Sequence, residues 1–337
     1  MKKLLFALSA IFFSTQMFAV SLEDFSLSVE PLFGMKWGQI DEYVFLKESN
    51  FSDDKLSELN WEIKPELYGG IKVQGGWKGF FEESFFTAGI PMRSGLMFDS
   101  DWQNIQYTAA NGGNTLQTNY SESENYLDYD FSFGFKGGYE FKVSEIVKIR
   151  PAIAFEYQNI KFTAKNGSGW YGNTAGTSGY HDYGPWYGYS DTENRTLFDF
   201  SGQIVIEYQR VSDFLWLGSD FSVDLPRCFI VTTGFFLAPY VYAVSFDAHN
   251  LKNYDYADRT AGYFAAFKWN LGAEYKITDR HSILLAANYF YMRVLRGDDY
   301  QKTSQSSSYT LVSSCDGGAG AKWFDLTLSY RFKILKN

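Results

Sequence analysis

Polar and apolar side chains alternate with a period of two along several stretches of the chain. In the clearest stretch, residues 323–332, the two alternating sets are Phe324, Leu326, Leu328, Tyr330 and Phe332, and Trp323, Asp325, Thr327, Ser329 and Arg331. Residues two apart share a face of a strand. A stretch of about ten such residues is typical of a strand that crosses a membrane, with one face toward lipid and one toward a barrel interior. Residues 149–160 alternate in the same way and predict another such strand.

One uncharged segment, residues 229–246, is long enough to raise the alternative of a membrane helix. It contains Gly234 and Pro239, which disfavour a helix, and it is rich in Phe, Tyr and Val, which favour strands. We therefore predict a strand here as well.

The connections between the predicted strands alternate between short and long. Short turns are expected near residues 75–76, 144–145, 225–227 and 278–279, and long polar loops near 47–57, 100–124, 165–200, 248–259 and 296–321. Four short turns and five long loops join ten strands, and an even number places both termini on the same, periplasmic side. The predicted fold is all-β: a ten-stranded antiparallel transmembrane β-barrel with long extracellular loops.

The first residues predict a secretory signal peptide. Met1-Lys2-Lys3 supplies positive charge, residues 4–13 are mostly apolar, and Phe18-Ala19 can end a cleavage site. We expect residues 1–19 to be removed and residues 20–337 to form a single barrel domain.

Composition agrees with a barrel and limits its partners. Aromatic residues make up 20% of the 337 residues, an excess that fits aromatic girdles at membrane interfaces. The formal net charge of −9 argues against nucleic-acid binding and suits a basic partner if the acids gather at one site. Cys228 and Cys315 lie far apart in the sequence, and two free thiols are the expectation.

Two short motifs carry the candidate chemistry. Asp247 and His249 lie two apart at the end of one predicted strand, and Asp99 and Asp101 lie two apart at the end of another. The aromatic positions beside them face lipid, so both pairs face the interior. A carboxylate beside an imidazole can hold its tautomer and raise its basicity, and two close carboxylates can share a proton and polarise a water. The motifs end the third and seventh predicted strands, nearly opposite each other across the barrel mouth.

These residues alone leave the function open. Three Asp and one His can also bind a metal ion, and an inert barrel and a pore are further alternatives. Against a pore, the predicted inward side chains Arg93, Arg150, Glu156 and Asp325 can form a packed polar plug in a narrow barrel.

The chain resembles the omptin family of outer-membrane endopeptidases over most of its predicted mature length. The stretch Met97-Phe98-Asp99-Ser100-Asp101-Trp102 is similar to the family's Asp-x-Asp-Trp, and Asp247-Ala248-His249 is similar to its Asp-x-His. Residues 42–46 with 59–61 resemble the family's first hairpin, residues 162–167 the start of its third loop, and residues 329–332 its terminal strand.

The resemblance implies a protease that forms no covalent intermediate and needs no metal. In this family pattern His249 would be the general base and Asp247 its orienting partner. Asp99 and Asp101 would bind the attacking water and stabilise the oxyanion.

The same resemblance implies cationic polypeptide substrates, because omptins prefer to cleave between two basic residues. Glu42 matches one acid of the pocket for the residue before the scissile bond, and Ser245 stands where the family has the other acid. We expect relaxed or altered preference at that subsite, and we expect Met97 to contact substrate too.

Lipopolysaccharide is the further ligand that the resemblance implies, as an activator on the lipid-facing surface. Lys161, Arg210 and Arg259 match basic positions of the family's lipid site, and Tyr157 matches its aromatic residue. One acid of that site is Asn159 here, so the lipid requirement stays open. The expected protein is a monomeric outer-membrane aspartyl-type endopeptidase with its site toward the exterior. A non-catalytic adhesin or binding barrel is the alternative.

Overall fold

The computed structural model describes residues 24–47, 54–103, 116–173 and 186–335. The predicted signal peptide, residues 1–19, lies outside these residues. Those described form thirteen β-strands: β1 (Phe25–Leu46), β2 (Lys55–Trp77), β3 (Phe80–Gly89), β4 (Met92–Asp101), β5 (Asn119–Tyr139), β6 (Phe141–Lys142), β7 (Val147–Tyr171), β8 (Thr196–Leu225), β9 (Phe229–His249), β10 (Tyr254–Gly262), β11 (Ala266–Lys276), β12 (His281–Thr303) and β13 (Thr310–Leu335). No helix among the described residues is long and apolar enough to cross a membrane.

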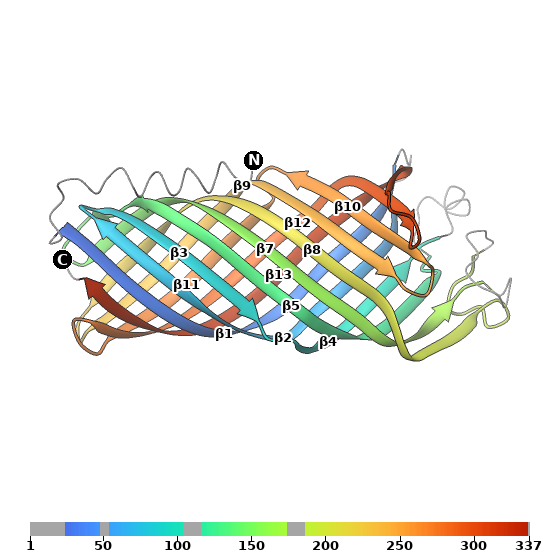
Figure 1. The fold of residues 1–337 in the computed structure, drawn as a ribbon, viewed down its shortest axis with the longest axis horizontal. Helices are drawn as coiled ribbons and strands as arrows, with labels where there is room; N and C mark the ends of the chain where they lie inside the picture. Colours follow the sequence, from blue (N-terminus) through green and yellow to red (C-terminus); the bar gives the residue numbers. More distant parts are fainter. Residues whose placement is uncertain (1–23, 48–53, 104–115, 174–185, 336–337) are drawn as a thin grey trace.

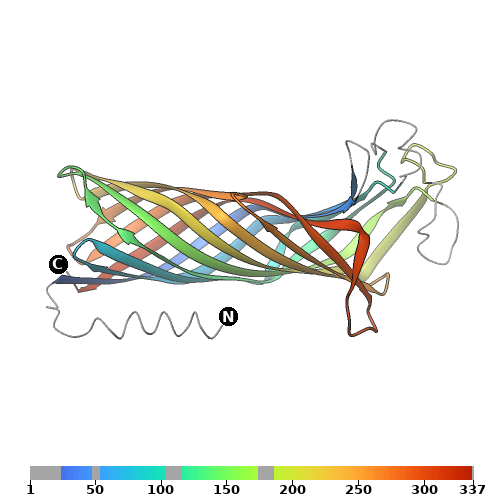
Figure 2. The ribbon, with the colours of Figure 1, turned by 90° about the horizontal axis from the view of Figure 1, so that it is seen from above.

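The strands form one closed antiparallel barrel (Figure 1). β1 pairs with β2 on one side and with β13 on the other, so the first and last strands close the ring. Residues 90–91 alone separate β3 from β4, residues 263–265 separate β10 from β11, and β6 follows β5 after one residue. Counting each interrupted strand once gives ten crossings, which agrees with the predicted ten-stranded barrel. β1 begins and β13 ends at the same end of the barrel (Figure 2).

Outward side chains over much of the length of the barrel are apolar and exposed, and we call this surface the apolar belt. On β9 and β13 it comprises Phe229, Val231, Phe235, Leu237, Tyr240, Phe324, Leu326, Leu328, Tyr330 and Phe332. A continuous apolar surface around a closed barrel is what lipid contact requires. The predicted alternation over 323–332 and the predicted strand over 229–246 are both confirmed.

The strands are longer than the sequence pattern predicts, because they continue beyond the apolar belt. The expected loop 100–124 shrinks to residues 102–118, and the expected loop 296–321 shrinks to 304–309. On β12 the extension carries Arg296, Asp298 and Lys302 on its outward face, so no apolar alternation marks the strand in the sequence.

The turns at the opposite end are short, as predicted, with one shift in position. The first turn lies at Lys78 and Gly79, rather than at 75–76, and both residues have positive φ, 50° and 90°. Gly accepts such a backbone without strain, which suits a tight hairpin. We call this end of the barrel the turn end and the other the loop end. Cys228 and Cys315 are free thiols, as expected.

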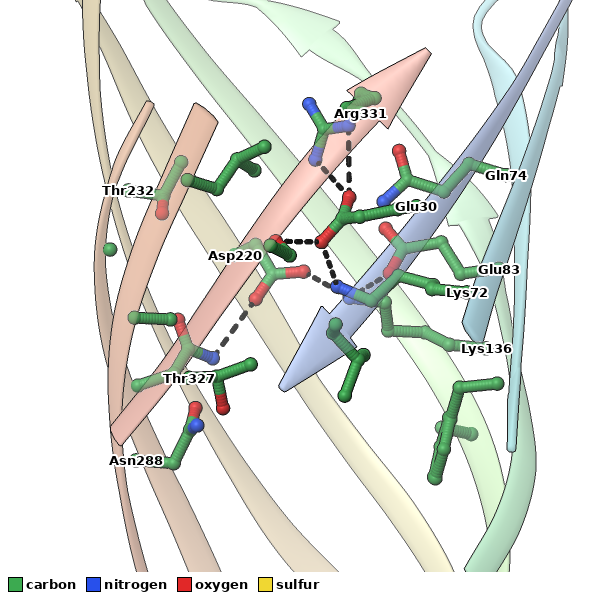
Figure 3. A pocket seen from close by; sticks show the side chains of 18 of the residues that line it. Glu30, Lys72, Gln74, Glu83, Lys136, Asp220, Thr232, Asn288, Thr327 and Arg331 are labelled. Carbon is green, nitrogen blue, oxygen red and sulfur yellow. Dashed lines mark hydrogen bonds and ion pairs between the residues drawn. The ribbon is translucent and has the colours of Figure 1, made fainter. Parts of the chain in front are cut away.

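The barrel interior at the turn end holds a cavity of about 810 Å³ lined by paired charges. Glu30 lies between Lys72 (3.3 Å) and Arg331 (2.9 Å), and Lys136 lies between Glu83 (3.1 Å) and Asp220 (2.7 Å), as Figure 3 shows. Opposite charges at these distances offset part of the cost of burying each one. Polar side chains therefore fill much of the interior, as expected of a narrow barrel.

Aromatic side chains close the interior between this cavity and the loop end. Phe290 stacks on Trp323, with 3.9 Å between ring centroids, and meets Phe214 and Trp216 edge-on at 5.5 and 6.1 Å. Phe290 belongs to β12 and Phe214 to β8, which are not neighbours in the ring, so the contact spans the lumen. This packed layer argues against an open pore.

Arg93 is the exception to the predicted inward charges. Its side chain is 54% exposed on the outer surface and pairs with Glu124 at 3.0 Å. The register of β4 against β5 shifts between Arg93 and Leu96. Parity counted from Asp99 therefore fails below this bulge, which turns Arg93 outward.

Candidate active site

Asp247 and His249 end β9 at the loop end of the interior. His249 Nε2 lies 2.6 Å from Asp247 Oδ2. The imidazole also meets the ring of Tyr256 on β10 edge-on, with 5.1 Å between centroids. The carboxylate thus orients the imidazole through Nε2 and leaves Nδ1 as its second proton-binding nitrogen.

Asp99 and Asp101 end β4, and the surrounding strands hold Asp101 through two contacts. The side-chain amide of Asn119 donates to Asp101 Oδ2 at 3.1 Å, and the Thr118 hydroxyl donates to the Asp101 backbone oxygen at 3.1 Å. Asp99 lies beside Leu59 of β2 and Ser121 of β5 in the strand register. The pair therefore shares the inner face at the loop end, as predicted.

The two pairs stand on different sides of the ring. Around one side β5, β7 and β8 separate β4 from β9, and around the other side β2, β1, β13, β12 and β10 do so. Burial and the like charge of Asp101 raise the pKa of Asp99 to about 7, and His249 and Asp247 also act on it from across the interior. The two pairs therefore face each other across the interior, as predicted.

Burial disfavours charge on both members of the Asp–His pair. It lowers the pKa of His249 to about 3, with Lys252 adding to the effect, and it raises the pKa of Asp247 well above its ordinary value. The imidazole is therefore neutral at physiological pH, the form in which one ring nitrogen keeps an unshared electron pair. Both pairs lie at the loop end, beyond the residues that define the apolar belt on β9.

Packed aromatic rings form the floor of this site. Trp61 on β2 stacks on Phe162 of β7 and on Tyr208 of β8, with centroid distances of 5.9 and 5.1 Å. Met97 belongs to the same buried cluster and is 0% exposed. Its side chain is covered by its neighbours in this structure, and its predicted contact with substrate stays a prediction.

Glu42 and Ser245 lie in a buried acidic cluster beside the Asp–His pair. Glu42 is 4% exposed, and the Ser245 hydroxyl lies 3.1 Å from the Tyr208 hydroxyl. Two further acids that the sequence analysis missed complete this cluster: Asp258 lies directly beside Ser245 in the β9–β10 register and beside Asp299 in the β10–β12 register. Both fall in stretches that were predicted as loops, where parity assigns no face, so no sequence signal placed them here.

Arg210 corrects the predicted lipid site. Its side chain is 2% exposed and points into the barrel, where it donates to the backbone oxygens of Gly320 (2.7 Å) and Asp41 (2.5 Å). It shares the inner face of β8 with the buried Tyr208 and Phe214. A guanidinium held inside the barrel cannot bind a lipid, so this prediction is wrong.

The other three predicted lipid-binding residues lie on the outer surface. Tyr157 stacks on Phe133 with 5.0 Å between ring centroids. Lys161 pairs with Glu207 at 2.8 Å, and the Arg259 guanidinium lies over the Tyr300 ring, 5.0 Å from its centroid. Lipid contact by these three residues stays a prediction.

The alternative of a metal site can be compared with the positions of the His, Cys, Asp and Glu side chains. Within the described ranges, no group of three or more His, Cys, Asp or Glu side chains is placed to hold a metal ion.

Comparison with solved structures agrees with this fold. The chain is similar to the crystal structure of the outer membrane protease OmpT from Escherichia coli, with a TM-score of 0.76 and 14% identity over 95% of this chain and 100% of that one. The translocator domain of the autotransporter NalP from Neisseria meningitidis gives a TM-score of 0.32 at 8% identity, over 95% of this chain and 92% of that one. The similarity to OmpT therefore shows a shared fold, and the similarity to NalP is too weak to use.

Comparison of sequences identifies the family. No curated protein sequence matches the chain. The model of the Omptin family, however, matches residues 23–334, which is nearly the whole chain. The sequence resemblance is thereby confirmed, and the chain belongs to the omptin family of outer-membrane proteases.

Proposed function

We propose that this protein is an endopeptidase that hydrolyses polypeptides at the outer face of the bacterial outer membrane, with Asp247, His249, Asp99 and Asp101 as its catalytic residues. The observation that carries the proposal is the 2.6 Å contact between His249 and Asp247, which faces a carboxylate pair across the same closed interior. The stacked rings of Trp61, Phe162 and Tyr208 close the interior beneath both pairs, so the site is a pocket at the mouth of the barrel and not part of a channel.

Each catalytic side chain has a role that its surroundings support. A water between the two pairs loses a proton to the neutral His249 imidazole as its oxygen attacks the peptide carbonyl. Asp247 stabilises the imidazolium that forms. Protonated Asp99 donates a hydrogen bond to the developing oxyanion, and Asp101 positions the water beside it. The imidazolium then returns the proton to the leaving amine as the C–N bond breaks. Because water is the nucleophile, no covalent intermediate with the protein forms.

Peptides with a central pair of basic residues are the substrates to test first, because the site is acidic. The refolded barrel is incubated with a fluorogenic peptide library centred on Arg and Lys, beside Asp99→Ala. Cleavage by the wild type and none by the folded variant supports the proposal. An intact barrel that cleaves no member of the library, with or without lipopolysaccharide, contradicts it and points to an adhesin or binding protein.

The pH dependence of cleavage should follow Asp99. Burial raises the pKa of Asp99 to about 7, so its carboxyl carries the proton it donates below pH 7 and loses it above. We expect kcat to fall as pH rises through about 7, by about tenfold per pH unit once the group is ionised. Asp99→Asn keeps an N–H donor that does not titrate, so its lower kcat should show no such fall. An identical alkaline limb in this variant would contradict the role of Asp99.

Lipopolysaccharide should activate the enzyme through the outer surface that carries Lys161. The Lys161 ammonium, which Glu207 holds at 2.8 Å, can also bind a lipid phosphate. Lys161→Ala should need about fivefold more lipopolysaccharide for half-maximal activity, since one such contact contributes about 1 kcal/mol. Lys302→Ala, which removes a lysine paired with Asp255 at 3.1 Å, is the control. Equal lipid requirement in all three proteins would remove Lys161 from the proposal.

A further inference from the structure

The acidic cluster beside the Asp–His pair contains three carboxylates that the proposed reaction does not use. Glu42 comes from β1, Asp258 from β10 and Asp299 from β12. All three are almost closed off from solvent, at 4%, 3% and 4% exposure. Burial and the neighbouring carboxylates raise the pKa of Glu42 and of Asp258, and burial followed by Asp316 raises that of Asp299 to about 6. The cluster is therefore poor in positive charge.

One carboxylate of the cluster has an oxygen without a partner in the protein. Glu42 Oε2 is buried and accepts no hydrogen bond, and neither does Asp247 Oδ1 next to it in the acid group. A buried polar atom without a partner costs about 1–3 kcal/mol, and more when it is charged. Such an atom beside an active site fits a hydrogen-bond donor that arrives with the substrate.

Arg210 is a buried cation whose charge acts on this cluster, but its hydrogen bonds go to backbone oxygens outside it. Its two terminal nitrogens donate to the backbone oxygens of Gly320 and Asp41, across the interior from β8. It lowers the pKa of Glu42 and Asp258 through its charge, though burial outweighs this effect. One guanidinium against three carboxylates leaves room for a second positive charge.

Asp258 occupies space that a glycine on the facing strand leaves open. A Cβ at Gly317 of β13 would lie 2.0 Å from Asp258 Oδ1, far inside van der Waals contact. In the register Asp258 lies between Ser245 and Asp299. The missing side chain of Gly317 thus lets the Asp258 carboxylate sit beside Ser245, the position where the resemblance expects an acid.

We propose that Asp258, seated over Gly317 and acting with Glu42 and Asp299, binds the positively charged side chain of the residue before the scissile bond. This proposal rests on the proposed peptidase function. It reverses the expectation from Ser245 alone: a carboxylate on the adjacent strand replaces the missing acid, so the preference for a basic residue is kept. A guanidinium or ammonium entering the cluster supplies the donor that Glu42 Oε2 lacks.

The test compares two peptides that differ only in arginine or citrulline before the scissile bond. Citrulline has nearly the shape of arginine without its charge. We expect the wild type to prefer arginine in kcat/KM, and Asp258→Asn to lower the ratio by about tenfold to a hundredfold, the range of a hydrogen bond to a charged group. Gly317→Ala should act in the same direction, because its Cβ displaces the Asp258 carboxylate. Asp298→Asn, an exposed acid next along β12, should leave the ratio unchanged.

A binding measurement separates this inference from the peptidase function. A non-cleavable pair of the same peptides, with a reduced scissile bond, is bound to His249→Ala with and without Asp258→Asn. A preference for arginine that depends on Asp258 supports the inference even if the wild type cleaves nothing. A ratio that Asp258→Asn leaves unchanged, in cleavage or in binding, overturns it. Folding of each variant is checked by the heat-dependent mobility of the barrel in gels.

Discussion

His249→Ala should reduce kcat by about 10²–10⁴-fold, the contribution of general-base catalysis, while the barrel stays folded. His249 is the only described histidine near the acid pairs, and its 2.6 Å contact with Asp247 holds the imidazole for proton transfer. The variant removes the base and leaves the aromatic floor unchanged. Initial rates on the preferred peptide of the library measure the effect, with intact folding confirmed by circular dichroism.

His281→Ala is the matched control for this substitution. His281 begins β12 at the turn end, where its Nδ1 lies 2.5 Å from the Tyr330 hydroxyl. It is half-buried at the opposite end of the barrel from the catalytic pairs, so its loss should leave kcat unchanged. Retention of more than about a tenth of the activity by His249→Ala would exclude its role as the base.

Arg210→Ala should destabilise the barrel by about 3–5 kcal/mol, the cost of breaking a buried charged interaction. Its guanidinium ties β8 to the backbone oxygens of Asp41 on β1 and Gly320 on β13. Removal leaves both oxygens without this donor and takes away a positive charge that acts on Glu42 and Asp258. Denaturant unfolding of the refolded protein, followed by tryptophan fluorescence, measures the loss.

Two further variants show whether the effect belongs to this geometry. Arg259→Ala removes an exposed arginine whose guanidinium lies over Tyr300, and its free energy of unfolding should stay within about 0.5 kcal/mol of the wild type. Arg210→Lys keeps the charge but replaces the planar fork with a single ammonium, so it should recover only part of the stability. If Arg210→Ala unfolds at the same denaturant concentration as Arg259→Ala, the hydrogen bonds of Arg210 to β1 and β13 do not stabilise the barrel.

Alternation in the sequence was enough to predict the barrel. A strand with one face in lipid needs apolar side chains at every second position. Residues 323–332 and 229–246 show this feature locally, independently of the rest of the chain. The same period placed Asp247 with His249, and Asp99 with Asp101, on one inner face. The prediction failed where lipid contact ends, since strand extensions beyond the belt carry no such pattern, and below the bulge that turns Arg93 outward.

Only the tertiary structure decided which residues from different strands meet. The neighbours of Ser245 depend on the register of β10 against β9 and β12, and a shift of one residue would have turned Asp258 outward. Arg210 likewise lies inside with Tyr208, although its match to a basic position of the family's lipid site predicted the outer surface. Sequence period determines the face of each strand, while closure of the ring and the register between strands determine which charges share a site.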